Sequence, residues 1–274
     1  MKLANKRWIG AANLLSNRSR HYHVAAFDQM IDDLNAQGVD HVLCTGDVTN
    51  LALEQEFAFA RHKFDRLAGG PDGVTVIPGN HDAYVAEGVE FFGRIFDEYH
   101  RPDPGWEWEG DRWPIVRVRG PLALIGVTTS RATPWFTAYG RVGEPQLARL
   151  RQVLGDPRLA GKVRVVAIHH PPAGRAAKSR IRGLRDHAAF ADVIREHGAD
   201  LIVHGHEHRD MTEALAGPTG EVPVRGIPSG TYQFNKPHRT ARYRIYEIEG
   251  AKISGDHVRI WDRDRSCFEP NPST

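Results

Sequence analysis

The chain is poor in cysteine, in long apolar runs and in net charge, and each shortage argues against a class of protein. Among its 274 residues are only two cysteines, Cys44 and Cys267, too few for a disulfide framework or a thiolate zinc site. This content is typical of a reducing compartment, so we expect a cytoplasmic protein. The N-terminal MKLANKRWIG has no apolar segment behind its charges, and no run is long enough to span a bilayer. We therefore expect neither secretion nor a membrane partner.

The charges nearly cancel. With 36 basic and 34 acidic residues, the formal net charge is +2, and no overall field attracts the chain to nucleic acid. An anionic ligand would have to be recognised locally. The hydrophobic content of 41% is ample for a core, and the sequence contains no internal repeat, low-complexity tract or linker. We expect a single domain over residues 1–274.

Segments with helical spacing of apolar residues alternate with short apolar runs that are typical of buried strands. The expected helices cover 21–37, 54–67, 144–154 and 186–197, and the expected strands cover 39–44, 74–77, 122–127, 163–168 and 201–203. This alternation favours a largely parallel sheet covered by helices on both faces.

The C-terminal part has a different pattern. Its expected strands, 222–227, 242–248 and 257–261, follow one another without helices, which indicates a second sheet or an antiparallel extension. Earlier in the chain, residues 105–120 alternate around Gly110-Asp111 and predict a hairpin.

Four polar motifs each begin where an expected strand ends. They are GDVTN after Thr45, GNHD at Gly79–Asp82, HHPP at His169–Pro172 and HGHEH at His204–His208. Because the carboxyl ends of parallel strands share one edge of a sheet, we expect these side chains to converge. A carboxylate, an amide and several imidazoles suit Mn, Fe, Co or Zn better than Mg or Ca. Each motif alone is also an ordinary turn, so the prediction of a metal site depends on all four occurring together.

The motifs GDxxN, GNHD, HHPP and GHxH, in this order, resemble the calcineurin-like metallophosphoesterases, and in particular their bacterial phosphodiesterases. The resemblance runs from about Arg7 to the last strands. It implies an α/β fold, a four-layer α-β-β-α sandwich of two mixed sheets. It also implies a hydrolase with a dinuclear centre of manganese, iron or zinc, which cleaves a small phosphodiester or phosphomonoester by a metal-activated hydroxide.

The resemblance assigns metal ligands residue by residue. Asp47 would bridge the two ions. Asn80, His169 and His206 would complete one ion, and His208 would bind the other.

The same resemblance assigns a catalytic pair. His81 would donate a proton to the leaving oxygen, and Asp82 would orient it. His170 and His204 are expected to pack around the ligands rather than to bind metal.

A basic segment follows HHPP and contains Arg175, Arg180 and Arg182. It is either a solvated loop or a rim that holds the phosphate of the substrate. A nuclease of the same fold is an alternative function, which the near-neutral charge does not favour. We assign no chemistry to the Trp135-Phe136 pair.

The first motif of the family, D-x-H on an opening strand, is not found in this sequence. In similar proteins it precedes the KR-x-x-G-x-x-N stretch, which here begins at Lys6. The second ion would then keep only His208 and the bridging Asp47. Three explanations remain: a chain that begins one strand late, a variant with one metal or with His21 and His23 as substitutes, and a catalytically impaired protein that binds metal or phosphate.

Overall fold

The computed structural model describes residues 24–232 and 238–271, and most of its elements follow the apolar pattern of the sequence. The α-helices are α2 (Val24–Gln37), α3 (Glu54–Phe64), α4 (Ala86–Ile95), α5 (Glu144–Leu154), α6 (Gly174–Ala177) and α7 (His187–His197), with short 3₁₀ helices at Asp97–His100 and Pro157–Leu159. The strands are β1 (Val42–Cys44), β2 (Val74–Val76), β3 (Ile115–Arg119), β4 (Leu122–Val127), β5 (Val163–Ile168), β6 (Leu201–His204), β7 (Met211–Ala216), β8 (Glu221–Gly226), β9 (Arg242–Glu249), β10 (Lys252–Asp262) and β11 (Cys267–Pro270).

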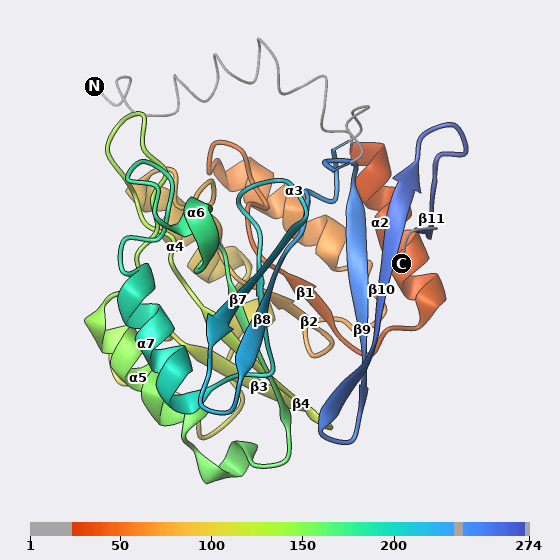
Figure 1. Cartoon of the computed structure of the whole chain (residues 1–274). Coiled ribbons are helices and arrows are strands. Elements are labelled where there is room, and N and C mark those ends of the chain that lie inside the picture. The colour runs from red at the N-terminus through yellow and green to blue at the C-terminus, as the bar shows by residue number, and fades with distance from the viewer. Residues whose placement is uncertain (1–23, 233–237, 272–274) are drawn as a thin grey trace.

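A six-stranded mixed sheet lies at the centre of the molecule (Figure 1). Its order is β3-β4-β5-β6-β8-β7; β4, β5, β6 and β8 are parallel, and β3 and β7 are antiparallel at the two edges. A second layer consists of the parallel pair β1-β2 and the antiparallel set β11-β10-β9.

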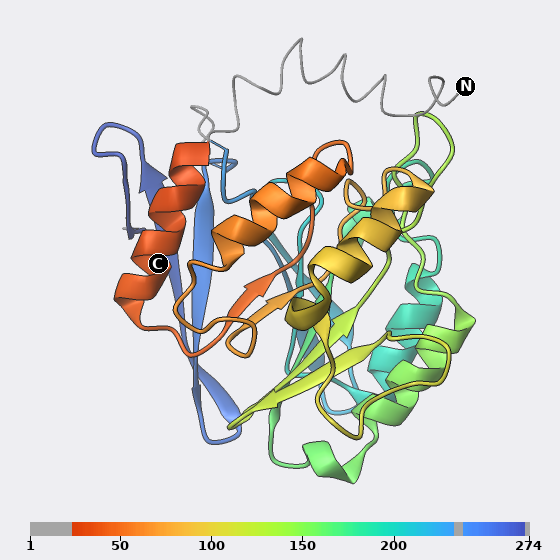
Figure 2. The ribbon, with the colours of Figure 1, turned by 180° about the vertical axis from the view of Figure 1, so that it is seen from behind.

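Alternation along the strands of the central sheet builds two separate cores. In β4, Ile125 packs with residues of α5 and α7, whereas Leu124 faces the second layer of strands. A third apolar cluster packs α3 and α4 onto β1 and β2. The layers are therefore helices, sheet, sheet and helices, and the two outer helical layers are visible in Figure 2.

The structure departs from the sequence prediction in residues 105–120. The first arm of the expected hairpin makes one isolated bridge, Trp108 to Asp111, and the second arm is β3, which pairs with β4. The hairpin prediction is wrong because the apolar residues Ile115 and Val116 are buried against the central sheet, where pairing with β4 satisfies their backbone. The sequence also did not predict α4, β7 and β11.

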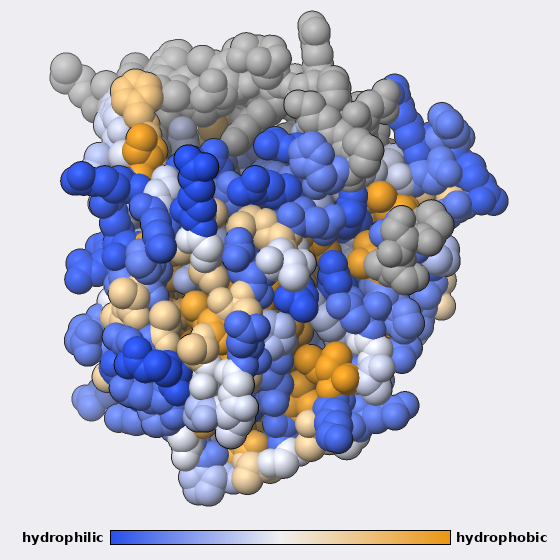
Figure 3. All heavy atoms as spheres, viewed as in Figure 1, coloured by the Kyte–Doolittle hydropathy of each residue, from blue (hydrophilic) through white to orange (hydrophobic). Residues whose placement is uncertain are grey.

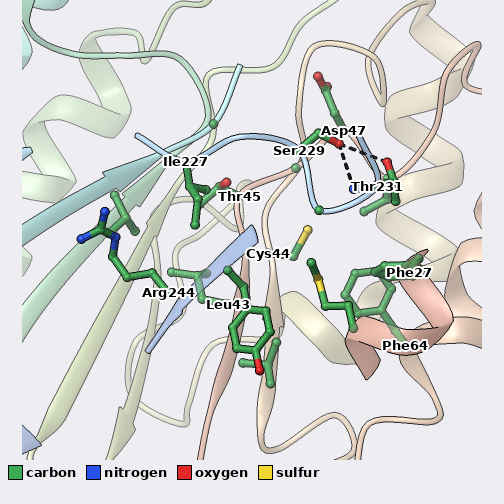
Figure 4. A pocket seen from close by; sticks show the side chains of 18 of the residues that line it. Phe27, Leu43, Cys44, Thr45, Asp47, Phe64, Ile227, Ser229, Thr231 and Arg244 are labelled. Atoms are coloured by element: carbon green, nitrogen blue, oxygen red, sulfur yellow. Dashed lines mark hydrogen bonds between the residues drawn. The ribbon is translucent and has the colours of Figure 1, made fainter. Parts of the chain in front are cut away.

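A cavity of about 800 Å³ lies between β1 and β9. Apolar side chains such as Phe27, Leu43 and Phe64 line it, and Figure 4 shows Leu43 and Cys44 projecting toward it. In the described part of the chain, β1 pairs only with β2 and β9 pairs only with β10, so each strand presents an unpaired edge. The cavity therefore lies between two open strand edges.

Candidate metal centre

The strand register brings the polar motifs to one edge of the molecule. Cys44 of β1 is level with Val76 of β2, and Ile168 of β5 is level with His204 of β6. HHPP follows β5 directly, GDVTN and GNHD follow β1 and β2 after a short link, and HGHEH begins at the last residue of β6. In each pair of neighbouring strands the two loops therefore emerge side by side.

Four side chains from these loops converge. His169 Nε2 is 3.5 Å from Asp47 Oδ2 and 3.1 Å from Asn80 Oδ1. His206 Nδ1 is 2.7 Å from the same Asn80 oxygen and 3.3 Å from His169 Nε2. Asn80 and His206, which are 126 positions apart in the chain, thus belong to one cluster of four donor atoms.

The chemistry of these atoms fits a cation. His169 Nδ1 lies 2.7 Å from the carbonyl of Thr45, which can only accept, so Nδ1 carries the proton and Nε2 turns a lone pair toward the cluster. The oxygens of Asn80 and Asp47 are also acceptors. His169 Nε2 therefore faces two other acceptors within 3.5 Å, an arrangement that a cation between them would make favourable.

The spacing fits as well. A metal with bonds of about 2.1 Å holds neighbouring donors roughly 3.0–3.4 Å apart. The observed contacts run from 2.7 to 3.5 Å. Among the described residues, no three side chains of the His, Cys, Asp or Glu type form a metal site by themselves. The candidate site therefore also needs the amide oxygen of Asn80, which contacts both His169 and His206.

Electrostatics keeps the ligands in the protonation states that bind metal. Burial opposes ionisation of Asp47, but the neighbouring His169 and His81 outweigh it and lower the pKa of Asp47 to about 2. Burial, together with the nearby His170 and His169, lowers the pKa of His206 well below its usual value. The carboxylate is therefore ionised and the His206 imidazole is neutral at physiological pH.

Two glycines allow the first two loops to pack backbone to backbone. A Cβ on Gly79 would lie 2.1 Å from Asp47 Oδ1, and a Cβ on Gly46 would lie 2.4 Å from Gly79 N. Gly46 also has a φ of 101°, which favours glycine. Only glycine at position 79 lets Asp47 and Asn80 share one site.

Asp82 fastens these two loops together. Its buried carboxylate accepts hydrogen bonds from the backbone N–H groups of Asp47, Val48, Thr49 and Gly79 and from the Thr49 hydroxyl. Burial and the Asp47 carboxylate raise the pKa of Asp82 to about 7, against these hydrogen bonds. Asp82 thus positions the loop that carries Asp47.

His81 stands beside the cluster and lines the cavity. Its Nδ1 lies 2.8 Å from the carbonyl of Asn50, and its ring stacks on Tyr84 with centroids 5.7 Å apart. We predicted that Asp82 orients this imidazole, but Nδ1 of His81 donates to the carbonyl of Asn50 instead. The carboxylate of Asp82 faces the other way because the amides of the neighbouring loop surround it.

The remaining histidines of the motifs differ in their surroundings. His208 lines the cavity together with Asp47. His170 is buried between the Thr129 hydroxyl and the carbonyl of Ala138, at 2.7 and 3.0 Å. His204 is buried at the end of β6, and burial lowers its pKa to about 4. His170 and His204 therefore pack around the ligands.

The basic segment reaches the site through one residue. Arg175, Arg180 and Arg182 are all exposed, and Arg182 donates to the carbonyl of His206 at 3.4 Å. The Lys6 motif and the His21 and His23 pair lie outside the described residues.

Sequence reasoning missed the groups that orient the ligands. The carbonyls of Thr45 and Asn50 hold His169 and His81, and the Thr49 hydroxyl binds Asp82. Backbone carbonyls leave no signal in a sequence, although Thr49 lies within the GDVTN motif.

The fold is α/β, and a cluster of oxygen and nitrogen donors at its strand ends forms a candidate metal site. The sequence model of the calcineurin-like phosphoesterases matches residues 21–210, which is more than half of the chain. The chain belongs to this family, as the motifs predicted.

Two relatives are similar to this chain in sequence. The chain is 26% identical over 195 residues to a probable cyclic nucleotide phosphodiesterase of Rhodococcus erythropolis, covering 70% of this chain and 58% of that protein. It is 32% identical over 132 residues to another probable cyclic nucleotide phosphodiesterase, of Synechococcus sp., covering 46% of this chain and 48% of that protein. The chain thus spans about half the length of these relatives.

A dimetal phosphatase of Danio rerio has a similar fold, with a TM-score of 0.61 at 13% identity, covering 89% of this chain and 87% of that one. A sulfate thiohydrolase of Thermus thermophilus matches with a TM-score of 0.53 at 18% identity, covering 91% of this chain and 44% of that one. The predicted fold of mixed sheets between helices is confirmed. Within the described ranges, no helix is long and apolar enough to cross a membrane.

Proposed function

We propose that the protein is a metal-dependent phosphodiesterase that hydrolyses a small phosphodiester. The convergence of Asp47, Asn80, His169 and His206 carries this proposal, because these atoms fit a divalent cation. When bound, divalent ions supply positive charge to the phosphoryl oxygens and lower the pKa of a water. The names of the two bacterial relatives favour a diester over a monoester.

The chain's own residues would divide the remaining work. His81 is positioned to donate a proton to the departing alkoxide: with Nδ1 at the Asn50 carbonyl, Nε2 is the atom that delivers it. Arg182, which donates to the carbonyl of His206, would attract the anionic substrate toward the cluster.

Hydrolysis of bis(p-nitrophenyl) phosphate with added Mn²⁺ tests the function. We expect turnover in the wild type and none in Asp47→Ala. Absence of turnover with every divalent metal, in a protein that still binds Mn²⁺, would favour a binding protein over an enzyme. Cleavage of single-stranded DNA under the same conditions would favour the nuclease.

We infer that the cavity between β1 and β9 takes one further strand. Val42 N and Cys44 O pair toward β2, so the peptide groups of Leu43 between them face the cavity. A small apolar molecule would leave these groups unpaired, whereas a strand would pair with them. A strand running parallel to β1 would end beside Asp47 and His208, where an Asp-x-His end could complete the second ion.

A peptide supplied in trans tests this inference. An eight-residue apolar peptide ending in Asp-x-His should slow hydrogen exchange at Leu43 and raise the Mn²⁺ content from one ion toward two. A matched peptide ending in Ala-x-Ala should slow exchange without raising the metal content. Unchanged exchange with both peptides would contradict the inference.

A further inference from the structure

Two loops beside the metal centre run side by side. They are residues 131–141 and 175–185, and Ala138 N donates to Ile181 O at 2.9 Å. The first loop accepts a hydrogen bond from His170 through the carbonyl of Ala138, and the second donates one from Arg182 to the carbonyl of His206. The pair, which we name the rim loops, therefore borders the candidate site, and Figure 1 shows the first loop rising near α6.

The rim loops expose large apolar side chains. Phe136 is 78% exposed, Ile181 56% and Trp135 48%; among the described residues, only two other large hydrophobics, Phe59 and Val89, are counted as exposed. Hydrophobic atoms stand out at the upper left of Figure 3, above strongly hydrophilic ones. Phe136 also has a φ of 63°, a strained conformation for an aromatic residue at a loop tip. A clustered apolar tip of this kind indicates an interaction surface.

All charged side chains of the rim loops are positive. Neither segment contains Asp or Glu, and together they carry seven cations: Arg131, Arg141, Arg175, Lys178, Arg180, Arg182 and Arg185. Arg141 lies 3.9 Å from Asp186, whose carboxylate also accepts from the backbone N–H groups of Val142 and Gly143. Within the described ranges, Arg131, Arg175, Lys178 and Arg180 are exposed and form no ion pair. The positive charge is therefore concentrated locally, although the net charge of the whole chain is only +2.

We propose that the rim loops dock the protein on an anionic phospholipid surface. Apolar side chains at the tip would enter the boundary between headgroups and acyl chains, and the surrounding cations would face lipid phosphates. A soluble ligand is usually held in a concave pocket, whereas Phe136 stands at a protruding turn between Pro134 and Thr137. The proposal departs from our sequence expectation of no membrane partner and does not depend on the proposed hydrolysis.

Sedimentation with vesicles tests the proposal. The full chain should bind vesicles of phosphatidylglycerol and phosphatidylcholine but not of phosphatidylcholine alone, and 0.5 M salt should weaken binding because it screens the cations. The double variant Trp135→Ala/Phe136→Ala should bind at least about tenfold more weakly, since two apolar side chains no longer enter the lipid. The matched control is Phe59→Ala, an exposed aromatic of α3, which should bind like the wild type.

Melting temperatures of the three proteins show whether each variant is folded. Absence of binding to anionic vesicles, or equal binding by the double variant and the wild type, would overturn the proposal. A third outcome would also overturn it: the wild type does not bind vesicles, and the double variant has a higher KM for a soluble phosphodiester. The loop tip would then take part in substrate binding.

Discussion

At the scale of single residues, the candidate site depends on how each ligand is held. His169 is fixed by one carbonyl, that of Thr45, and Asn80 bridges the two imidazoles. The strand ends predicted that the polar motifs would converge, and the resemblance to the metallophosphoesterases assigned the individual ligands. The sequence could not predict the orienting groups, since a carbonyl of any residue type could serve and only the folded backbone decides which one does.

The imidazole of His81 is expected to affect catalysis without affecting metal binding. His81→Ala should lower kcat for bis(p-nitrophenyl) phosphate by roughly 10²- to 10⁴-fold, the usual contribution of a general acid. His62→Ala, at an exposed position of α3, is the control. If the Mn²⁺ affinity of His81→Ala fell by the same factor as its kcat, His81 would be a metal ligand rather than a general acid.

The carboxylate of Asp82 is expected to affect stability. In Asp82→Asn, an amide N–H₂ group would face several backbone N–H groups, so the free energy of unfolding should fall by about 2 kcal/mol or more in urea titrations. Asp72→Asn, whose side chain is 99% exposed, should change it by less than about 0.5 kcal/mol. Equal effects of the two substitutions would contradict the role given to Asp82.

At the scale of elements, the order of strands and helices was largely predictable from periodicity. Alternation along β4 and β5 distinguishes the two faces of the central sheet, and Gly38, at a φ of 64°, ends α2 as expected. The pairing of this segment was not predictable, because Val116 and Val118 alternate with arginines in the same way whichever strand they pair with. Pairing partners are decided by tertiary contacts that a local pattern does not contain.

The close approach of two loops gives a prediction at this scale. Gly79→Ala would place a Cβ against the backbone and carboxylate of Asp47, so the loops must separate. We expect a lower melting temperature and a Mn²⁺ affinity reduced at least about tenfold. Gly93→Ala in α4, where a Cβ meets nothing within 4 Å, should instead leave Mn²⁺ affinity unchanged and stabilise the helix by up to about 1 kcal/mol. Unaltered metal binding in Gly79→Ala would contradict this account of the loops.

At the scale of the whole molecule, buried histidines make the stability depend on pH. Burial lowers the pKa of His41, His100 and His204 to about 4 and that of His170 to about 3. The unfolded chain binds these protons below pH ~6.5 and the folded chain does not. Their stabilisation is therefore complete above pH ~6.5 and is lost as the pH falls toward 4.

His100 tests this dependence away from the metal centre. Its Nδ1 donates to the carbonyl of Phe96, and its Nε2 accepts from Arg112, so it must stay neutral. In urea titrations of chelator-treated protein between pH 7 and 5, the slope of unfolding free energy against pH should be shallower in His100→Asn by up to about 1.4 kcal/mol per pH unit. Parallel slopes for the two proteins would contradict the neutral assignment.

The central claim concerns the whole chain, because it requires four distant segments to hold one ion. Calorimetric titration of the metal-free protein with Mn²⁺ tests it most directly. We predict one tightly bound ion per chain, an affinity at least about 100-fold lower in His169→Ala, and no change in the control His197→Ala at the end of α7. Absence of Mn²⁺ binding, or equal binding by His169→Ala and the wild type, would contradict the account.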